Sequence, residues 1–226
     1  MKNRHHWPKL FSLLLAFTLF LGGCGIPDDA RQAGEMRSVT DGMGTTVSVP
    51  VSPKRVVSYG VSTDDMLIPI LGTDRIAAIA EMPANLEEAA KIKGRISNTT
   101  ESIIGEVPDL VIMPSWLKAE FIDEIRSAGI PVYVYKMPTE IEGTIATIHE
   151  LAAVVGEEER GNAFAGETED RIRALDDFLK TIPEEKRLTS VFARPNGIGG
   201  GKGSTFDGLC QHAGVCLLYT YDAADE

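Results

Sequence analysis

Side chains able to bind a ligand recur just after the short apolar runs of this sequence. Such runs have the length and content of buried strands, and in open α/β sheets the ligand lies beyond the carboxyl ends of the strands. Aromatic and methionine side chains offer apolar contact area to a ligand, and cationic groups suit carboxylates. The residues selected in this way predict a binding cleft: Tyr59, Ser62, Thr63, Met82, Ser115, Trp116, Lys136, Arg194 and Asn196.

Several of these residues also have a structural interpretation. Trp116 and Tyr59 are able to pack in the core, with Tyr59 capping the end of a strand, while Lys136 and Arg194 are able to lie solvated on the surface. We favour ligand contact for Trp116, because it follows a continuous apolar run. Both interpretations stay open for the other three.

Patterns that would indicate an enzyme are incomplete. Ser115 and Lys118 have the Ser-x-x-Lys spacing of acyl-transfer enzymes, but the accompanying Ser-Asp-Asn and Lys-Thr-Gly motifs are missing. The run from Gly197 to Ser204 resembles a phosphate-binding loop, yet Asn196 replaces its first glycine and Gly203 stands where Ser or Thr is needed. We therefore interpret the run as a flexible loop at the edge of a cleft and predict no catalytic residues.

Composition excludes further classes of protein. The chain of 226 residues carries a formal net charge of −11, which argues against nucleic acid as a partner. Beyond the N-terminal segment it has two histidines, His149 and His212, too few to favour a directly ligated zinc or manganese ion. We expect neither a resident metal nor a cofactor, and three cysteines make no disulfide framework.

The N-terminal segment has the features of a signal peptide. Lys2, Arg4 and Lys9 precede an apolar run from Leu10 to Leu21, which is short of the roughly 20 residues of a spanning helix. The run closes with Leu-Gly-Gly-Cys24, which resembles the lipobox of bacterial lipoproteins. This resemblance implies cleavage after residue 23, lipidation of Cys24 and an extracytoplasmic, membrane-anchored chain with a flexible tether over 24–38. A free cysteine after an ordinary signal is the alternative.

The segment 53–72 organises the rest of the chain. It reads as a strand over 55–59, a break at Gly60 and a helix capped by Ser62 or Thr63 and ended by Gly72. A hairpin is predicted before it, and Gly94–Thr100 is predicted to be a loop. Further strands are predicted at 76–80, 110–113, 131–135 and 188–193, and helices at 85–93, 119–127, 144–155 and 157–182.

This alternation predicts an α/β fold in which a Rossmann-like lobe contains a parallel sheet with right-handed crossovers. The lobe is expected to span 39–156. A bracing helix over 157–183 should follow, and then the beginning of a second α/β lobe over 184–215. We expect a monomer.

Four motifs resemble those of the substrate-binding proteins of bacterial iron-siderophore, haem and cobalamin ABC importers. They are Pro-Lys-Arg-Val-Val at 53–57, Ile-Leu-Gly at 70–72, Thr-Glu at 100–101 and Pro-Asp-Leu-Val-Ile at 108–112, within a likeness covering Val39 to Gly214. The resemblance implies two lobes, a ligand held between them and delivery to a permease without a reaction. It also implies that Glu101 docks on the permease; the alternative is a carboxylate favoured by the helix dipole.

Two-lobed members of that family are longer, by roughly 60–100 residues given ordinary domain sizes. The segment 216–226 does not continue the expected pattern, and we predict that it is non-native and carries no function. Iron-siderophore, haem and cobalamin all remain candidate ligands. An exported chelatase-like or hydrolytic lipoprotein, or a structural surface lipoprotein, would be the alternative functions.

Overall fold

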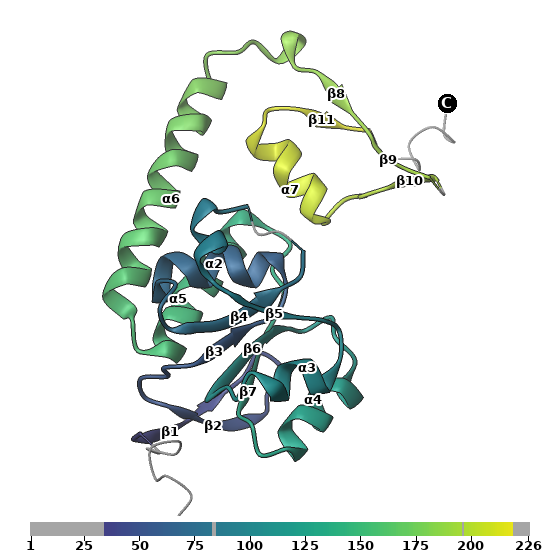
Figure 1. The fold of residues 1–226 in the computed structure, drawn as a ribbon. Coiled ribbons are helices and arrows are strands. Elements are labelled where there is room, and N and C mark those ends of the chain that lie inside the picture. The colour runs from purple at the N-terminus through teal and green to yellow at the C-terminus, as the bar shows by residue number, and fades with distance from the viewer. Residues whose placement is uncertain (1–33, 83–84, 196, 219–226) are drawn as a thin grey trace, which may run out of the picture. The chain divides into compact units, whose positions relative to one another are not determined.

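The five-stranded sheet at the centre of the protein is parallel throughout. The computed structural model describes residues 34–82, 85–195 and 197–218 (Figure 1). Neighbouring strands follow the order β5-β4-β3-β6-β7, and every pair is parallel. The predicted α/β fold is therefore confirmed, with strands β3 (Val56–Ser58), β4 (Ile76–Ala80), β5 (Gly94–Ile96), β6 (Leu110–Pro114) and β7 (Val132–Tyr135).

Helices cover both faces of this sheet. Alternate side chains of β3 enter opposite cores, with Val56 in one cluster and Val57 in the other. Helices α2 and α5 pack on the first face and α3 and α4 on the second (Figure 1). This two-sided burial explains the continuous apolar strands. The helical segments of this part are α2 (Val61–Leu71), η2 (Glu87–Lys91), α3 (Thr100–Gly105), α4 (Ala119–Ser127) and α5 (Ile141–Val155).

The predicted N-terminal hairpin is present as β1 (Met36–Thr40) and β2 (Thr46–Pro50). Its turn is held by buried Asp41, which accepts the backbone N–H groups of Met43 and Thr45 and pairs with Arg126 of α4 at 2.8 Å. In addition, the Gly42 N–H donates to the Val134 carbonyl at 2.7 Å. The hairpin is thereby fastened to the edge strand β7.

Two local predictions are wrong for identifiable reasons. Helix α2 begins at Val61 after Gly60, whose φ of 104° turns the chain directly from β3 into the helix, so neither Ser62 nor Thr63 is its cap. The segment Gly94–Thr100, predicted to be a loop, contains β5. This strand is three residues long, too short for its apolar pattern to stand out.

The long helix α6 (Glu158–Leu179) lies within the range predicted for a brace. The predicted strand at 188–193 is wrong as a single element, since its two halves have different partners. Thr189–Ser190 pairs with Cys216–Leu217, whereas Phe192–Arg194 pairs with Gly197–Gly199. The C-terminal elements are η3 (Glu184–Lys186), β8 (Thr189–Ser190), β9 (Phe192–Arg194), β10 (Gly197–Gly199), α7 (Thr205–His212) and β11 (Cys216–Leu217).

The two ends of the chain are only partly described. The predicted signal peptide and Cys24 lie outside the described residues, as does the tether up to Ala33. Of the segment predicted to be non-native, residues 216–218 are described, and β11 pairs with β8 in a two-stranded parallel sheet. Within the described ranges, no helix has the length and apolarity needed to cross a membrane.

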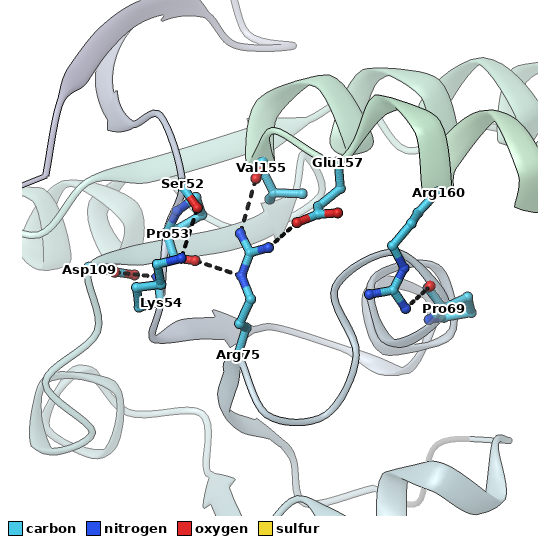
Figure 2. Close-up of polar contacts among 9 residues, drawn as sticks. All are labelled: Ser52, Pro53, Lys54, Pro69, Arg75, Asp109, Val155, Glu157 and Arg160. Carbon is cyan, nitrogen blue, oxygen red and sulfur yellow. Dashed lines mark hydrogen bonds and ion pairs between the residues drawn. The ribbon is translucent and has the colours of Figure 1, made fainter.

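Arg75 joins three separate segments at the amino end of the sheet (Figure 2). Its guanidinium donates to the Pro53 carbonyl at 2.9 Å and to the Val155 carbonyl at 3.2 Å, and it pairs with Glu157. One turn into α6, Arg160 donates to the Pro69 carbonyl at 2.8 Å (Figure 2). The start of the long helix is thereby fixed to the sheet and to α2.

We expect Arg75→Met to lower the free energy of unfolding by about 2–4 kcal/mol. The arginine side chain is 14% exposed, and methionine would replace its stem while leaving two carbonyls and Glu157 without their donor. Chemical denaturation measures the change. Arg173→Met is the control, because Arg173 is 67% exposed and its ion pair is solvated. Equal effects of the two substitutions would contradict the structural role of Arg75.

Candidate functional site

The carboxyl ends of the five parallel strands meet at one edge of the sheet. The chain leaves these ends through Tyr59, Glu81, Ser97, Ser115 and Lys136. The loops at this edge and the first turn of α2 therefore carry all the binding residues predicted from the first lobe, although those residues are spread over 78 positions of sequence, from 59 to 136. Some of them point into solvent and others into the protein.

Two large apolar side chains are exposed at this edge. Trp116 is 64% exposed and Met82 is 68% exposed. Ser62 and Lys136 are exposed as well. Ser115 is half-buried, and its hydroxyl oxygen accepts the Met137 N–H at 3.1 Å, which ties the loop after β6 to the loop after β7. A largely exposed indole and a largely exposed thioether are available to a ligand here.

Tyr59 and Thr63 are instead buried beneath the exposed side chains of this edge, in a layer that we call the floor of the site. Tyr59 is 6% exposed, donates its hydroxyl proton to Asn98 Oδ1 at 2.7 Å, and packs edge-to-face on Phe121. Burial raises the pKa of the Tyr59 phenol. Thr63 is fully buried and donates to the Tyr59 carbonyl at 2.8 Å. The structure thus gives both residues a supporting position, and direct ligand contact by them stays a prediction.

The floor also contains polar residues that the sequence analysis did not identify. The Tyr135 hydroxyl lies 3.0 Å from Thr63 Oγ1, and buried Asp64 accepts a hydrogen bond from the Ser58 hydroxyl. Asn98 was missed because β5, the strand before it, was predicted to be part of a loop. Asp64 was missed because nothing in the sequence marks it as buried.

Asp64 is electrostatically unusual. One carboxyl oxygen takes the Ser58 hydrogen bond, while the other is buried without a hydrogen-bond partner among the described residues. Burial raises the pKa of this carboxyl from 3.8 to about 7, and the Ser58 hydrogen bond opposes the shift. The neutral, protonated form is therefore favoured over much of the acidic range.

The raised pKa predicts that Asp64 makes the stability of the protein depend on pH. Between pH 4 and pH 7 the folded state keeps a proton on Asp64 that the unfolded chain has lost. The contribution of this proton to the free energy of unfolding is therefore complete at low pH and disappears as the pH rises. The free energy of unfolding of the wild type should fall by roughly 2–4 kcal/mol between pH 4 and pH 8, relative to that of Asp64→Asn, which cannot ionise. Urea denaturation at each pH measures the difference, and a pH-independent difference would contradict the assignment.

The remaining predicted residues are Arg194, Asn196 and Glu101. Arg194 is exposed at the end of β9, and Asn196 lies outside the described residues. Glu101 is exposed in the first turn of α3, and its carboxylate accepts a long hydrogen bond of 3.5 Å from the Thr100 hydroxyl. It makes no ion pair with any described residue. Nothing in the described part therefore neutralises the Glu101 carboxylate.

A small cavity lies between the start of α5 and α7. Its volume is about 100 Å³, below the roughly 300–1,000 Å³ of a typical ligand pocket. None of the predicted binding residues lines it; the lining consists of Pro138, Thr139, Glu140, Ile141, Thr144, Thr205, Gly208 and Leu209. Within the described residues, no three His, Cys, Asp or Glu side chains are grouped closely enough to hold a metal ion.

The sequence profile of the family described as "Periplasmic binding protein" matches residues 56–218, and the chain belongs to this family. Among characterised proteins, it is 25% identical over 144 residues to the cobalamin-binding protein of Halobacterium salinarum. That alignment covers 62% of this chain and 39% of the relative, so the chain spans about two fifths of the relative's length.

Solved structures show the same fold at low sequence identity. The heme-binding protein HmuT is 22% identical, with a TM-score of 0.68 over 90% of this chain and 70% of that one. The molybdate-binding protein MolA of Haemophilus influenzae, solved with molybdate, is 20% identical, with a TM-score of 0.66 over 80% of this chain and 65% of that one. Proteins of this fold therefore bind quite different solutes.

Proposed function

We propose that this chain belongs to an extracytoplasmic lipoprotein that captures a metal chelate for an ABC importer and performs no reaction on it. Iron-siderophore, haem and cobalamin are the candidate chelates. The observation that carries the proposal is the exposure of Trp116 and Met82 at the carboxyl edge of a parallel sheet in a periplasmic binding protein. The names of the cobalamin-binding and heme-binding proteins described above support this class of ligand.

The physical basis is the match between this edge and a flat, weakly polar ligand. An exposed indole and a flexible thioether both gain contact area and dispersion energy when a conjugated ring covers them. The buried hydrogen bonds of Tyr59, Thr63 and Tyr135 hold the floor in place before the ligand arrives, which limits the ordering cost of binding.

The proposed organisation follows from the same function. A lobe over 39–156 would bear this edge, the segment 157–183 would brace it, and 184–215 would begin the second lobe. The proposed lipid on Cys24 would tether the protein, as a monomer, near its permease. The segment 216–226 is proposed to carry no part of the function.

Trp116 fluorescence tests capture directly. We expect one of cyanocobalamin, hemin or a ferric siderophore to quench the Trp116 emission saturably, measured as the difference between wild type and Trp116→Phe. Met82→Ala should weaken that binding by roughly 3–10-fold through lost contact, whereas Met36→Ala, on β1, should not change it. Conversion of a chelate to a product, with the emission unchanged, would support an exported enzyme instead.

Delivery to the importer is proposed to use Glu101. Its carboxylate is exposed on α3, and a cationic site on a permease would supply the ion pair that the described residues do not. Two exposed apolar side chains follow Glu101 along the same segment: Ile104, which is 39% exposed, and Val107, which is 67% exposed.

Charge reversal separates delivery from capture. We expect Glu101→Arg to bind chelate like the wild type but to lower, by about 10-fold or more, the stimulation of ATP hydrolysis by the purified permease–ATPase complex of its importer. Glu120→Arg is the matched control, because Glu120 is likewise exposed in the first turn of a helix, α4. The proposal for Glu101 fails when both variants stimulate equally.

A further inference from the structure

Asn98 lies at the carboxyl edge of the sheet, although no sequence pattern identified it. Strand β5 ends at Ile96, and Asn98 follows two residues later as an exposed side chain. Its amide oxygen accepts a hydrogen bond of 2.7 Å from the hydroxyl of Tyr59, the residue that directly follows β3. Because β4 lies between β3 and β5, this bond reaches across the end of β4. Asn98 is thereby placed beside the loop that carries Met82.

The hydrogen bond from Tyr59 fixes the orientation of the Asn98 amide. Tyr59 is buried and packs edge-to-face on Phe121, with ring centres 5.6 Å apart, so the phenol has a defined position. Burial also raises the pKa of this phenol, which therefore keeps the proton that it donates. The amide oxygen is engaged in this way, whereas the amide NH2 group has no acceptor among the described residues. An oriented, uncharged donor is left at the exposed edge.

The surroundings of this donor favour a neutral acceptor over an anion. Glu81 directly follows β4, and its backbone N–H donates to the Ile96 carbonyl at 3.2 Å, so this acidic residue lies at the ends of β4 and β5. Glu81 makes no ion pair with any described residue. Arg95 binds backbone carbonyls at the start of β5, and Lys136 follows β7, four strand spacings from β5, which is on the order of 19 Å. A ligand carboxylate at Asn98 would therefore be repelled by Glu81.

We propose that Asn98, oriented by Tyr59, donates a hydrogen bond to a neutral carbonyl oxygen at the periphery of the captured ligand. The inference rests on the proposed capture of a metal chelate and specifies its chemistry. The chelate carries carboxamide or hydroxamate carbonyls, as cobalamin and hydroxamate siderophores do, in contrast to haem, whose peripheral polar groups are carboxylates. A chelate that covered Asn98 without offering an acceptor would leave its N–H groups buried and unpaired, which is unfavourable, so the residue discriminates among chelates.

Asn98→Asp and Asn98→Ala test this contact on the full chain. At pH 7.5 an aspartate still accepts the Tyr59 hydrogen bond, but it presents an oxygen to the ligand where asparagine presents N–H donors. We expect Asn98→Asp to weaken the binding of cyanocobalamin or ferrichrome by about 10–100-fold and Asn98→Ala by about 3–10-fold, measured by isothermal titration calorimetry. A purely structural role of Asn98 predicts the reverse order, because only alanine removes the hydrogen bond to Tyr59.

Tyr59→Phe tests the positioning role of Tyr59. Loss of the hydroxyl frees the Asn98 amide to rotate, and we expect the binding of cyanocobalamin or ferrichrome to weaken by about 2–5-fold. In the Asn98→Ala background the same substitution should not weaken binding further, because no amide is left to orient. Asn162→Asp is the matched control and should leave binding unchanged, since Asn162 is exposed on α6, where its amide oxygen lies 3.0 Å from His149 Nδ1. Circular dichroism and thermal unfolding establish that each variant is folded.

The outcomes distinguish this inference from the proposed function. If the wild type binds cyanocobalamin or ferrichrome and Asn98→Asp binds as tightly, or more tightly than Asn98→Ala, the ligand contact is wrong and chelate capture stands. Binding of hemin alone overturns the neutral carbonyl and likewise leaves capture intact. If hemin, cyanocobalamin and ferrichrome all fail to bind, the proposed function is wrong and this inference is wrong with it.

Discussion

The parallel direction of the five strands is the constraint on which the rest of this structure depends. Parallel strands need a crossover between each pair, and the crossovers place helices on both faces of the sheet. Both faces are therefore buried, and the sheet remains open only where the strands begin and end, at its amino and carboxyl edges. Of these, the carboxyl edge collects the loops that carry Met82, Trp116 and Lys136, so that residues far apart in sequence share one surface.

The carboxyl end of the sheet supports the proposed site, whereas the amino end anchors the long helix. At the carboxyl end, buried hydrogen bonds of Tyr59, Thr63 and Tyr135 hold the floor of the proposed site, and Asp64 is buried there at an electrostatic cost. At the amino end, Arg75 fixes the start of α6 (Figure 2). The long helix is consequently anchored away from the surface proposed to receive the ligand, and that surface is free of the anchoring contacts.

Much of the fold was predictable because its signals are local. Apolar β-branched runs predicted β3, β6 and β7, and glycines at 72 and 156 ended the helices where they were expected. The predictions failed where the signal was short or the partner distant. Strand β5 has three residues, and the segment 188–193 divides at Val191 because β8 and β9 pair with different strands.

The sequence by itself determined the α/β order and the approximate ends of β3, β4, β6 and β7, and hence most of the residues near the carboxyl edge. Which of them face solvent was decided only by the tertiary structure, since burial depends on neighbours supplied from other elements. Tyr59 is covered by Phe121 and Asn98, whereas nothing comparable covers Trp116 among the described residues. The stacking of Phe192 in β9 on Phe206 in α7 likewise depends on a residue from another element, a contact that strand periodicity cannot encode.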